Sequence, residues 1–407
     1  MQAHRLSVAL AALIATLTCI SADAATHDLR LLARAPGDLV PARLQSATKL
    51  ATANLDRTPV SVSWALDGAQ ALDARPQPFV RDSREYWIDA SETELQRGID
   101  LALSAPGAVV RVSPHGNNAD AKLVAGDIQL SVAGKRLDDT HAIRNIAGDD
   151  ELQAAGMDAP QGSVALRLSD SIAAGSVKLA VPAARGNYLV HVFEPASAIA
   201  LHLGAERDGV SAGQAMRVRA SLEGAASIAR IGGIVSAPDG YSQDIDFVRQ
   251  IDGSYAADFT PDPAHAAGPG LWEAHAFATS GGKNATPRDA KTAFAVSAAV
   301  ARLDGSAERV DAKDGVTVRI GIETTAASRY MVSGVLYGTG VDGALHPAAI
   351  AQSAAWLGTG HGTLDLRYDA SSIDGALHGP WEMHDLRLVN QADLGLLERR
   401  ERALALP

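Results

Sequence analysis

The sequence has little of two residue types on which many compact functional sites depend. Cysteine occurs once in 407 residues, as Cys19, and aromatic side chains make up 4% of the chain. A single cysteine cannot form an intramolecular disulfide, and the cysteine pairs of common zinc sites are absent. A His-Glu-x-x-His segment is absent as well, so no metal centre and no cofactor are predicted. Stability must come from hydrophobic cores, and a domain with its own core typically takes ~100–150 residues.

Positive charge is also in short supply. Lysine and arginine total 36 against 47 aspartates and glutamates, and the formal net charge is −11. An acidic balance disfavours nucleic-acid phosphates and anionic lipids as partners. Beyond the N-terminus no apolar run approaches the ~20 residues that a membrane-spanning helix needs. We therefore predict no nucleic-acid partner and no membrane span, and we expect a monomer.

The N-terminus has the features of an export signal. Arg5 precedes an apolar run over residues 6–17, and residues 22–24 (Ala-Asp-Ala) supply the small side chains that a signal peptidase accepts. The run is about a dozen residues long, too short to span a bilayer. We predict a signal peptide over residues 1–24 and a periplasmic or secreted mature protein. Lipid attachment at Cys19 is an alternative, although the residues before it match a lipoprotein signal poorly.

Alternation of apolar residues with others dominates the rest of the chain and favours β-strands. It is found in residues 128–132, 164–168, 177–181, 216–222, 255–259, 316–322 and 364–368. This period of two places one face of each strand in a core. Asp-Gly turns, such as those at 252–253 and 314–315, separate the strands. Many short strands with this spacing predict a mainly β fold made of β-sandwich domains.

An internal repeat divides the chain into modules. The pattern Gly-x-aromatic-x-x-His occurs at residues 186–191, 270–275 and 379–384. Its aromatic residues, Tyr188, Trp272 and Trp381, are separated by 84 and 109 residues, which are single-sandwich distances. We expect each aromatic residue to anchor a separate core near the start of a strand. In the third copy, a bulge near His384 and Asp385 would bring the apolar residues on both sides of it to one face.

We therefore predict three tandem sandwiches after an extended lead-in. The predicted boundaries are residues 25–48 for the lead-in, 49–196 for an N-terminal β-rich domain, 197–298 for an immunoglobulin-like domain and 299–407 for a C-terminal immunoglobulin-like domain. Ser91 and Glu94 form a capping box, which predicts a helix that continues toward Leu103, although Gly98 weakens it. A second short helix is expected over residues 150–155. The N-terminal domain is thus β with short helical inserts.

Three segments resemble one protein family. They are residues 86–103, 108–113 and 379–390. In them the chain is similar to an uncharacterised family of exported bacterial proteins, known as a domain of unknown function, and the similarity would cover most of the mature chain. The resemblance implies an N-terminal mixed β domain followed by immunoglobulin-like domains. It implies no activity, and no site residues follow from it.

Candidate catalytic and metal-binding residues are few. Ser211 stands in a Gly-x-Ser-x-Gly segment, but a strand pattern follows it where a nucleophile elbow needs a helix. The repeat histidines, His191, His275 and His384, are expected on the strand face opposite the aromatic residue, as exposed or interdomain residues. The aspartate pair at 138–139 lacks the spacing of a calcium loop. We predict no catalytic residue and no metal ligand.

The aromatic residues outside the repeat are the remaining candidates for binding. They are Trp64, Tyr86, Trp87 and Trp356, and any that are exposed could bind sugars by stacking. Tyr86 and Trp87 are adjacent on a predicted strand, so they point to opposite faces and one of them lies outside the core. If exposed, that residue marks a contact surface on the N-terminal domain. Burial under the helix that follows Ser91 is the alternative.

Three kinds of function remain open. The first is a non-catalytic envelope or secreted protein that binds a protein or glycan partner through sandwich surfaces, which the tandem architecture and the scarcity of catalytic residues favour. The second is a hydrolase of peptides or envelope polymers with its site in the N-terminal domain, where polar residues are richest. The third is a spacer or accessory module for a secreted enzyme. Fold alone does not choose between them.

Overall fold

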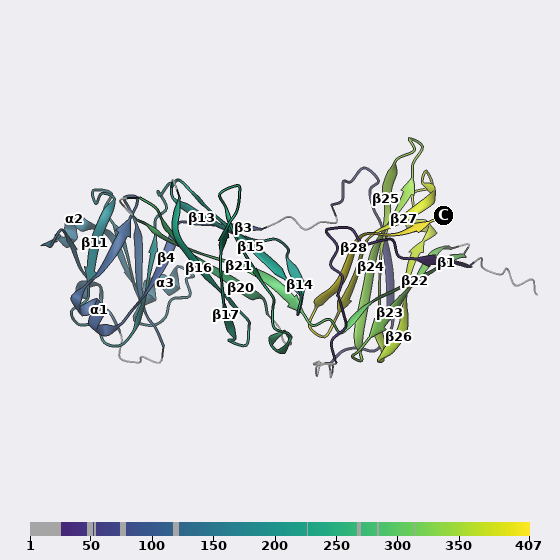
Figure 1. The fold of residues 1–407 in the computed structure, drawn as a ribbon, viewed down its shortest axis with the longest axis horizontal. Helices are drawn as coiled ribbons and strands as arrows, with labels where there is room; N and C mark the ends of the chain where they lie inside the picture. The colour runs from purple at the N-terminus through teal and green to yellow at the C-terminus, as the bar shows by residue number, and fades with distance from the viewer. Residues whose placement is uncertain are drawn as a thin grey trace, which may run out of the picture.

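The structure is a computed structural model, and it is mainly β. It describes residues 26–46, 52, 54–73, 79–116, 122–225, 227–266, 270–282, 285–312 and 314–407; the predicted signal peptide lies outside them. The described strands form six sheets that enclose three separate hydrophobic cores, which confirms the prediction of tandem β-sandwiches. Figure 1 shows the three sandwiches in a row. Within the described residues, no helix is long and apolar enough to cross a membrane.

The first sandwich packs a sheet of order β4-β12-β6-β10-β9 against one of order β5-β11-β7-β8. Its strands are β4 (Glu85–Ala90), β5 (Ile99–Leu103), β6 (Val109–Pro114), β7 (Gln129–Val132), β8 (Lys135–Arg136), β9 (Ile143–Gly148), β10 (Val164–Leu168), β11 (Gly175–Ala180) and β12 (Tyr188–Phe193). Its short helices are α1 (Glu92–Arg97), η1 (Ala125–Asp127), α2 (Asp139–Ala142) and α3 (Asp149–Ala154). Alternate residues of β12 are buried, as the period of two requires.

The capping box at Ser91 is present, and the helix it starts is shorter than the sequence suggested. The Ser91 hydroxyl accepts the Glu94 N–H, and the Glu94 side chain accepts the Ser91 N–H. The helix ends at Arg97 because Gly98 has a φ of 88°, a left-handed conformation that glycine adopts readily. Residues up to Leu103, expected on the helix, instead form β5. The second expected helix is α3.

The middle sandwich packs a sheet of order β18-β19-β15-β13-β3 against one of order β14-β21-β20-β16-β17. Its elements are β3 (Val80–Ser83), β13 (Ala200–Ala205), β14 (Gly209–Ser211), β15 (Met216–Glu223), β16 (Ile228–Ser236), β17 (Ser242–Ile245), β18 (Val248–Arg249), β19 (Tyr255–Phe259), η2 (Pro263–His265), β20 (Trp272–Ser280) and β21 (Pro287–Ser297). Strand β14 pairs with β21 in parallel, and the other pairs are antiparallel.

The C-terminal sandwich packs a sheet of order β1-β22-β23-β26 against one of order β2-β25-β24-β27-β28. Its elements are β1 (Thr26–Arg30), β2 (Val60–Ala65), β22 (Ala301–Ala312), β23 (Gly315–Thr324), β24 (Ser328–Thr339), β25 (Leu345–Leu357), β26 (Gly360–Asp369), η3 (Ala370–Ser372), β27 (His378–Asn390) and β28 (Gly395–Leu406). Most of its strands have ten residues or more.

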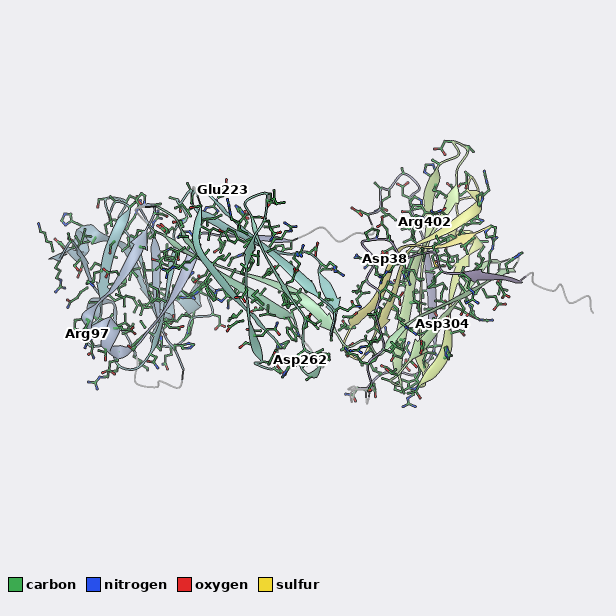
Figure 2. The ribbon with its side chains drawn as sticks, viewed as in Figure 1. Asp38, Arg97, Glu223, Asp262, Asp304 and Arg402 are labelled. Carbon is green, nitrogen blue, oxygen red and sulfur yellow. The ribbon has the colours of Figure 1, made fainter. Side chains whose placement is uncertain are left out.

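The N-terminal lead-in is part of the C-terminal sandwich. Strand β1 pairs with β22, and β2 pairs with β25, so each completes the edge of one sheet. Between them, Asp38 accepts the Glu401 N–H at 2.7 Å, and Figure 2 shows Asp38 and Arg402 on this sandwich. Strand β3 joins the middle sandwich in the same way. The three segments thus pair with strands far along the chain, whereas the predicted boundaries place β1 in the lead-in and β2 and β3 in the N-terminal domain.

The three aromatic residues of the repeat lie in three different sandwiches, as the sequence predicted. Tyr188 and Trp272 are each 1% exposed and lie in the first and middle cores, whereas Trp381 is half-buried against the third. Met383 fills the third core instead. The expected bulge is present: the pairing of β27 with β28 shifts after Met383, and Asp385 has a φ of 47°.

Candidate functional site

Trp87 and Tyr86, the two contact candidates, lie on opposite faces of β4. Tyr86 is 1% exposed in the first core, and its hydroxyl donates to the Ala102 carbonyl. Trp87 is half-buried and faces the middle sandwich, where its ring stacks on His191 at 4.9 Å and meets the edge of His275 at 5.9 Å. Two of the three repeat histidines are thus brought together by one tryptophan. Trp87 forms part of the junction between the first two sandwiches.

A buried ion pair crosses the same junction. The Arg288 guanidinium, on β21, lies 2.7 Å from the Glu194 carboxylate, and neither side chain is exposed. Arg288 also donates to the hydroxyls of Ser104 and Ser197 and to the Ile199 carbonyl. Glu194 in turn accepts the Ser104 and Ala105 N–H groups, so both charged groups have hydrogen-bond partners, which a buried charge requires. Glu194 lies at the predicted boundary between the N-terminal and middle domains, where it fixes one sandwich to the next.

Three more ionisable groups of the junction have altered proton affinities. Burial raises the pKa of Asp289 to about 6, although its carboxylate accepts the Trp87 N–H. Burial lowers the pKa of His275 to about 4. A hydrogen bond from His191 holds the pKa of Glu85 below its ordinary value. Such shifts mark functional sites or structural networks, and the contacts here describe a network that packs two domains together.

A row of cross-strand neighbours on the outer face of the C-terminal sandwich forms a second candidate site. In register, the row runs through Trp64 on β2, Ile350 on β25, Val335 on β24 and His384 on β27. Their chain neighbours, such as Ala349, Leu336 and Met383, lie in the core, so the row points outward. Trp64 is 50% exposed at one end of it.

A pocket of about 410 Å³ lies on this row, which we call the C-terminal pocket. One wall is the segment that follows β2, residues 66–73, which we call the roof segment. The lining residues are Leu66, Leu72, Asp73, Val335, Tyr337, Ile350, His384, Asp385 and Glu401. Val335 is only 6% exposed although it points away from the core. The pocket therefore combines apolar walls with carboxylates, an imidazole and a phenol.

The bulge on β27 shapes the polar side of the C-terminal pocket. The positive φ of Asp385 is uncommon for a residue with a side chain, and such conformations gather at ligand sites. Arg387 holds the Asp385 carboxylate with contacts of 2.9 and 2.7 Å. The ring of Tyr337 lies 4.4 Å from that of His384. Burial, together with the charge of Asp385, raises the pKa of Tyr337, so its hydroxyl stays protonated and able to donate.

Glu382, which lies between Trp381 and His384 in the third copy of the repeat, holds the His384 ring in place. His384 Nε2 lies 2.8 Å from the Glu382 carboxylate, which Arg402 of β28 also holds. Partial burial favours a higher pKa for Glu382, but the hydrogen bonds from Arg402 and His384 outweigh it and lower the pKa. Glu382 is therefore an anion that fixes the orientation of the imidazole. Of the repeat histidines, His384 lines the C-terminal pocket, whereas His191 and His275 contact Trp87.

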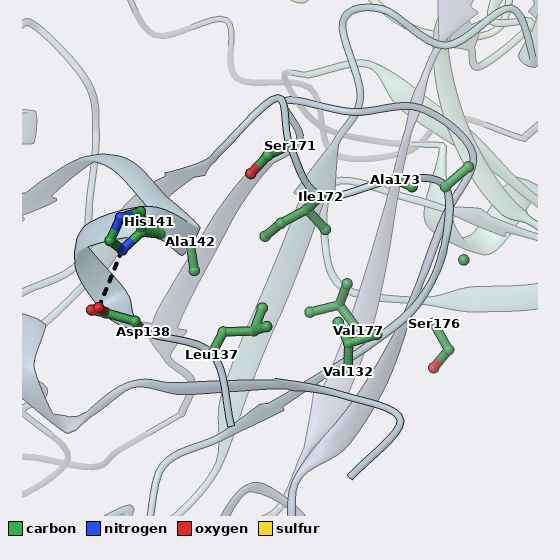
Figure 3. Close-up of a pocket in the computed structure, with 12 residues that line it drawn as sticks. Val132, Leu137, Asp138, His141, Ala142, Ser171, Ile172, Ala173, Ser176 and Val177 are labelled. Carbon is green, nitrogen blue, oxygen red and sulfur yellow. Dashed lines mark hydrogen bonds and ion pairs between the residues drawn. The ribbon is translucent and has the colours of Figure 1, made fainter. Parts of the chain in front are cut away.

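The N-terminal domain has a pocket of its own, of about 360 Å³, which we call the N-terminal pocket. Figure 3 shows Ile172 and Val177 at its centre and the pair Asp138–His141, from the start of α2, at its rim. The rim pair is joined at 3.1 Å and is largely exposed. Ser171 lines the same opening, but its hydroxyl bonds that of Ser169. The lining is mostly apolar.

Two further candidates from the sequence, Ser211 and Asp138, have structural roles. Ser211 is 1% exposed, at the end of β14, where it pairs with β21 instead of starting a helix. Asp138 accepts the Thr140 N–H as the cap of α2. Among the described residues, no group of three or more acidic, histidine or cysteine side chains is placed to hold a metal ion. The sequence pointed to His384 and Trp64, and to Asp385 only as a bulge position; it gave no signal for Tyr337 and Glu401, which belong to no local motif.

The fold is that of a tandem β-sandwich protein whose first and last segments share one domain, and comparison with known proteins places it in a family. The DUF4785 N-terminal domain model, a domain of unknown function, matches residues 51–194, and the DUF4785 C-terminal domain model matches residues 299–407. Together they cover more than half of the chain, and the chain belongs to this family. This agrees with the resemblance to an uncharacterised family seen in the sequence.

Solved structures add a likeness in fold. A crystal structure of a DUF4785 family protein from Legionella pneumophila matches 91% of this chain and 99% of its own, with a TM-score of 0.71 and 18% identity. A tetra-tandem repeat from the extending region of a large adhesion protein covers 87% of this chain and 83% of its own, at 15% identity and a TM-score of 0.20, which is too low to indicate a shared fold. No curated protein matches the chain.

Proposed function

We propose that this protein is a non-catalytic binding protein, exported to the envelope or secreted, that holds a glycan partner in the C-terminal pocket. The observation that supports this is the row in which half-exposed Trp64 adjoins a pocket with both apolar and polar walls. A sugar ring presents an apolar face of C–H groups and an edge of hydroxyls. Sites for small ligands combine apolar walls with a few fixed polar groups in the same way.

Each part of the site has a role in this proposal. Trp64 provides a flat, accessible surface on which a ring can stack. The neutral Tyr337 hydroxyl donates or accepts, and Asp385, fixed by Arg387, accepts hydrogen bonds from ligand hydroxyls. The volume of about 410 Å³ lies within the ~300–1,000 Å³ of ordinary ligand sites. One sugar residue in the pocket, with a second on Trp64, is the arrangement we propose.

Retention on an array of purified bacterial envelope glycans tests the proposal. Trp64→Ala should weaken binding of any retained glycan about 10-fold, the loss expected of an aromatic anchor worth about 1.4 kcal/mol. Trp356→Ala is the matched control, because Trp356 lies on β25 and the Arg57 guanidinium covers its ring at 4.1 Å. Equal retention of the two variants would contradict the proposal. Capture of a protein through the same face, with no glycan bound, would favour the protein-partner form.

A hydrolase site in the N-terminal domain is the second candidate. The observation that favours it is the N-terminal pocket, where the Asp138–His141 pair and Ser171 line one opening. A histidine oriented by a carboxylate is the arrangement that activates a serine nucleophile. Labelling of Ser171 by a fluorophosphonate probe, abolished by His141→Gln, would replace the binding proposal with this one. The exposed pair and the Ser169 partner of Ser171 make the glycan site the better-supported candidate.

A further inference from the structure

The roof segment is attached to the sheet at two points. The Leu66 N–H donates to the Ala348 carbonyl at 2.9 Å, which continues the pairing of β2 with β25. Two residues later, the Gly68 carbonyl lies 3.1 Å from Nδ1 of His346, near the start of β25. Beyond Leu66 the roof segment leaves the sheet, so the contact with His346 holds the part that leads to the pocket residues Leu72 and Asp73.

Both ring nitrogens of His346 face oxygen acceptors. Nδ1 faces the Gly68 carbonyl, and Nε2 lies 3.0 Å from both carboxylate oxygens of Asp342. A carbonyl and a carboxylate can only accept, so each contact needs an N–H from the ring. Neutral imidazole carries one N–H, whereas the imidazolium cation carries two. The complete set of hydrogen bonds therefore exists only when His346 is protonated.

The surroundings of His346 favour the protonated form. Asp342 comes from the turn before β25, and its carboxylate also accepts the Ala344 N–H, which helps to keep its pKa low and the group ionised. The acidic residue of the roof segment beside Gly68 is Asp67, whose carboxylate accepts the Ala69 N–H. On β24 the residue opposite His346 is Gly338, and on β27 His378 bonds the Gly379 carbonyl. Hydrogen bonds to Asp342 and Gly68 raise the pKa of His346.

We propose that His346 is a pH-sensitive latch that closes the roof segment over the C-terminal pocket when it is protonated. This inference concerns regulation of the same site and rests on the proposed function only for the identity of the ligand. The closed roof is favoured at mildly acidic pH. Because the pKa of His346 is raised in the folded protein, the latch is complete below the ordinary histidine value of ~6.5 and is lost as the pH rises through the raised value.

Hydrogen exchange of the full chain, measured by mass spectrometry without any ligand, tests the latch directly. Protection of a peptide covering residues 66–73, corrected for intrinsic exchange rates, should fall about 2- to 10-fold between pH 5.5 and 8.5, the range for loss of one hydrogen bond. In His346→Gln this pH dependence should disappear. His378→Gln is the matched control in the same sandwich and should retain it.

A second variant keeps the test decisive if His346→Gln fails to fold. Asp342→Asn removes the anion beside the ring, so the midpoint of the protection change should move to lower pH. The latch proposal would be overturned if the hydrogen-exchange protection of the roof segment were constant with pH in the wild type. It would also be overturned if this protection changed equally in His346→Gln. If the roof responds but no glycan is retained at any pH, the proposed function fails and the latch stands. If a glycan binds and the roof does not respond, the latch alone fails.

Discussion

Arg288 and Glu194 form an ion pair, 2.7 Å apart, that is wholly excluded from solvent between two β-sandwiches. Arg288 belongs to β21 of the middle sandwich, and Glu194 directly follows β12 of the first. Because four further hydrogen-bonding groups surround the guanidinium, the pair fixes the orientation of one domain on the other. The junction is thus a specific polar contact, formed at the boundary predicted between residues 196 and 197.

Removing one member of this pair should destabilise the junction strongly. Arg288→Met leaves the Glu194 carboxylate buried without a counter-charge, which costs roughly 3–5 kcal/mol. Scanning calorimetry should show the transition of the first two sandwiches at markedly lower temperature. Lys291→Met, on the same strand but in an exposed pair with Glu273, should change stability by less than ~1 kcal/mol. Similar shifts for both variants would contradict a structural role for the buried pair.

Asp289 gives the junction a pH dependence of definite sign. Its folded-state pKa of about 6 lies above the ordinary value of 3.8, so the folded protein binds this proton more tightly than the unfolded chain. The charged group therefore lowers the free energy of unfolding above pH 6, and the penalty vanishes as the pH falls toward 3.8. Asp289→Asn keeps an acceptor for the Trp87 N–H and removes the charge.

Urea unfolding at several pH values measures this effect. Asp289→Asn should be more stable than the wild type at pH 8, by on the order of 1–3 kcal/mol, and equal to it near pH 4. Comparison at the same pH cancels the contribution of His275, whose depressed pKa of about 4 makes acid destabilising in both proteins. A variant that is less stable than the wild type at pH 8 would show that the carboxylate is needed as an anion.

The repeat tryptophans should differ in their contributions to stability. Trp272 is 1% exposed in its core, and replacing it by alanine should cost about 3–5 kcal/mol. Trp381 is half-buried, and Met383 occupies the corresponding core position. Trp381→Ala should therefore lower the free energy of unfolding by less than half as much. The loss should be seen in the unfolding transition of the C-terminal sandwich. A larger loss for Trp381 than for Trp272 would refute this assignment of the cores.

The C-terminal sandwich should depend on the N-terminal strands β1 and β2 for its fold. A fragment of residues 299–407 lacks β1 and β2, which complete its two sheets, and exposes the core against which Leu29 and Leu31 pack. We expect this fragment alone to lack the near-ultraviolet circular dichroism of a packed core. Adding a chain of residues 26–73 should restore it, because strand pairing between separate chains satisfies the open edges. A fully structured fragment on its own would contradict this.

Local features of the structure were predictable from the sequence because their causes are local. The alternation in residues 188–192 predicted a strand with one buried face, and β12 has that pattern. The capping box at Ser91 predicted where α1 begins. The predicted helix is longer than α1 because the apolar residues between Leu95 and Leu103 have mixed spacing, which suits a short helix followed by a strand equally well. Gly98, with its positive φ, separates the two.

Long-range pairing and the candidate site were not predictable in the same way. Nothing in residues 60–65 indicates that they pair with residues 349–354, because the alternation of a strand does not specify its partner. The C-terminal pocket depends on that pairing, since β2 leads into the roof segment. His384 stood out through the repeat and Trp64 as an unassigned aromatic residue, but Tyr337 and Asp385 become site residues only when β24 and β27 lie side by side.

The central claim is that a ligand occupies the C-terminal pocket, and methyl NMR of the full chain titrated with a retained glycan tests it most directly. The two pockets carry matched probes: Leu66, Leu72, Val335 and Ile350 line the C-terminal one, and Leu137, Ile172 and Val177 line the N-terminal one. We predict shifts confined to the first set. Shifts confined to the second set, or absent from both while the glycan is bound, would contradict the account.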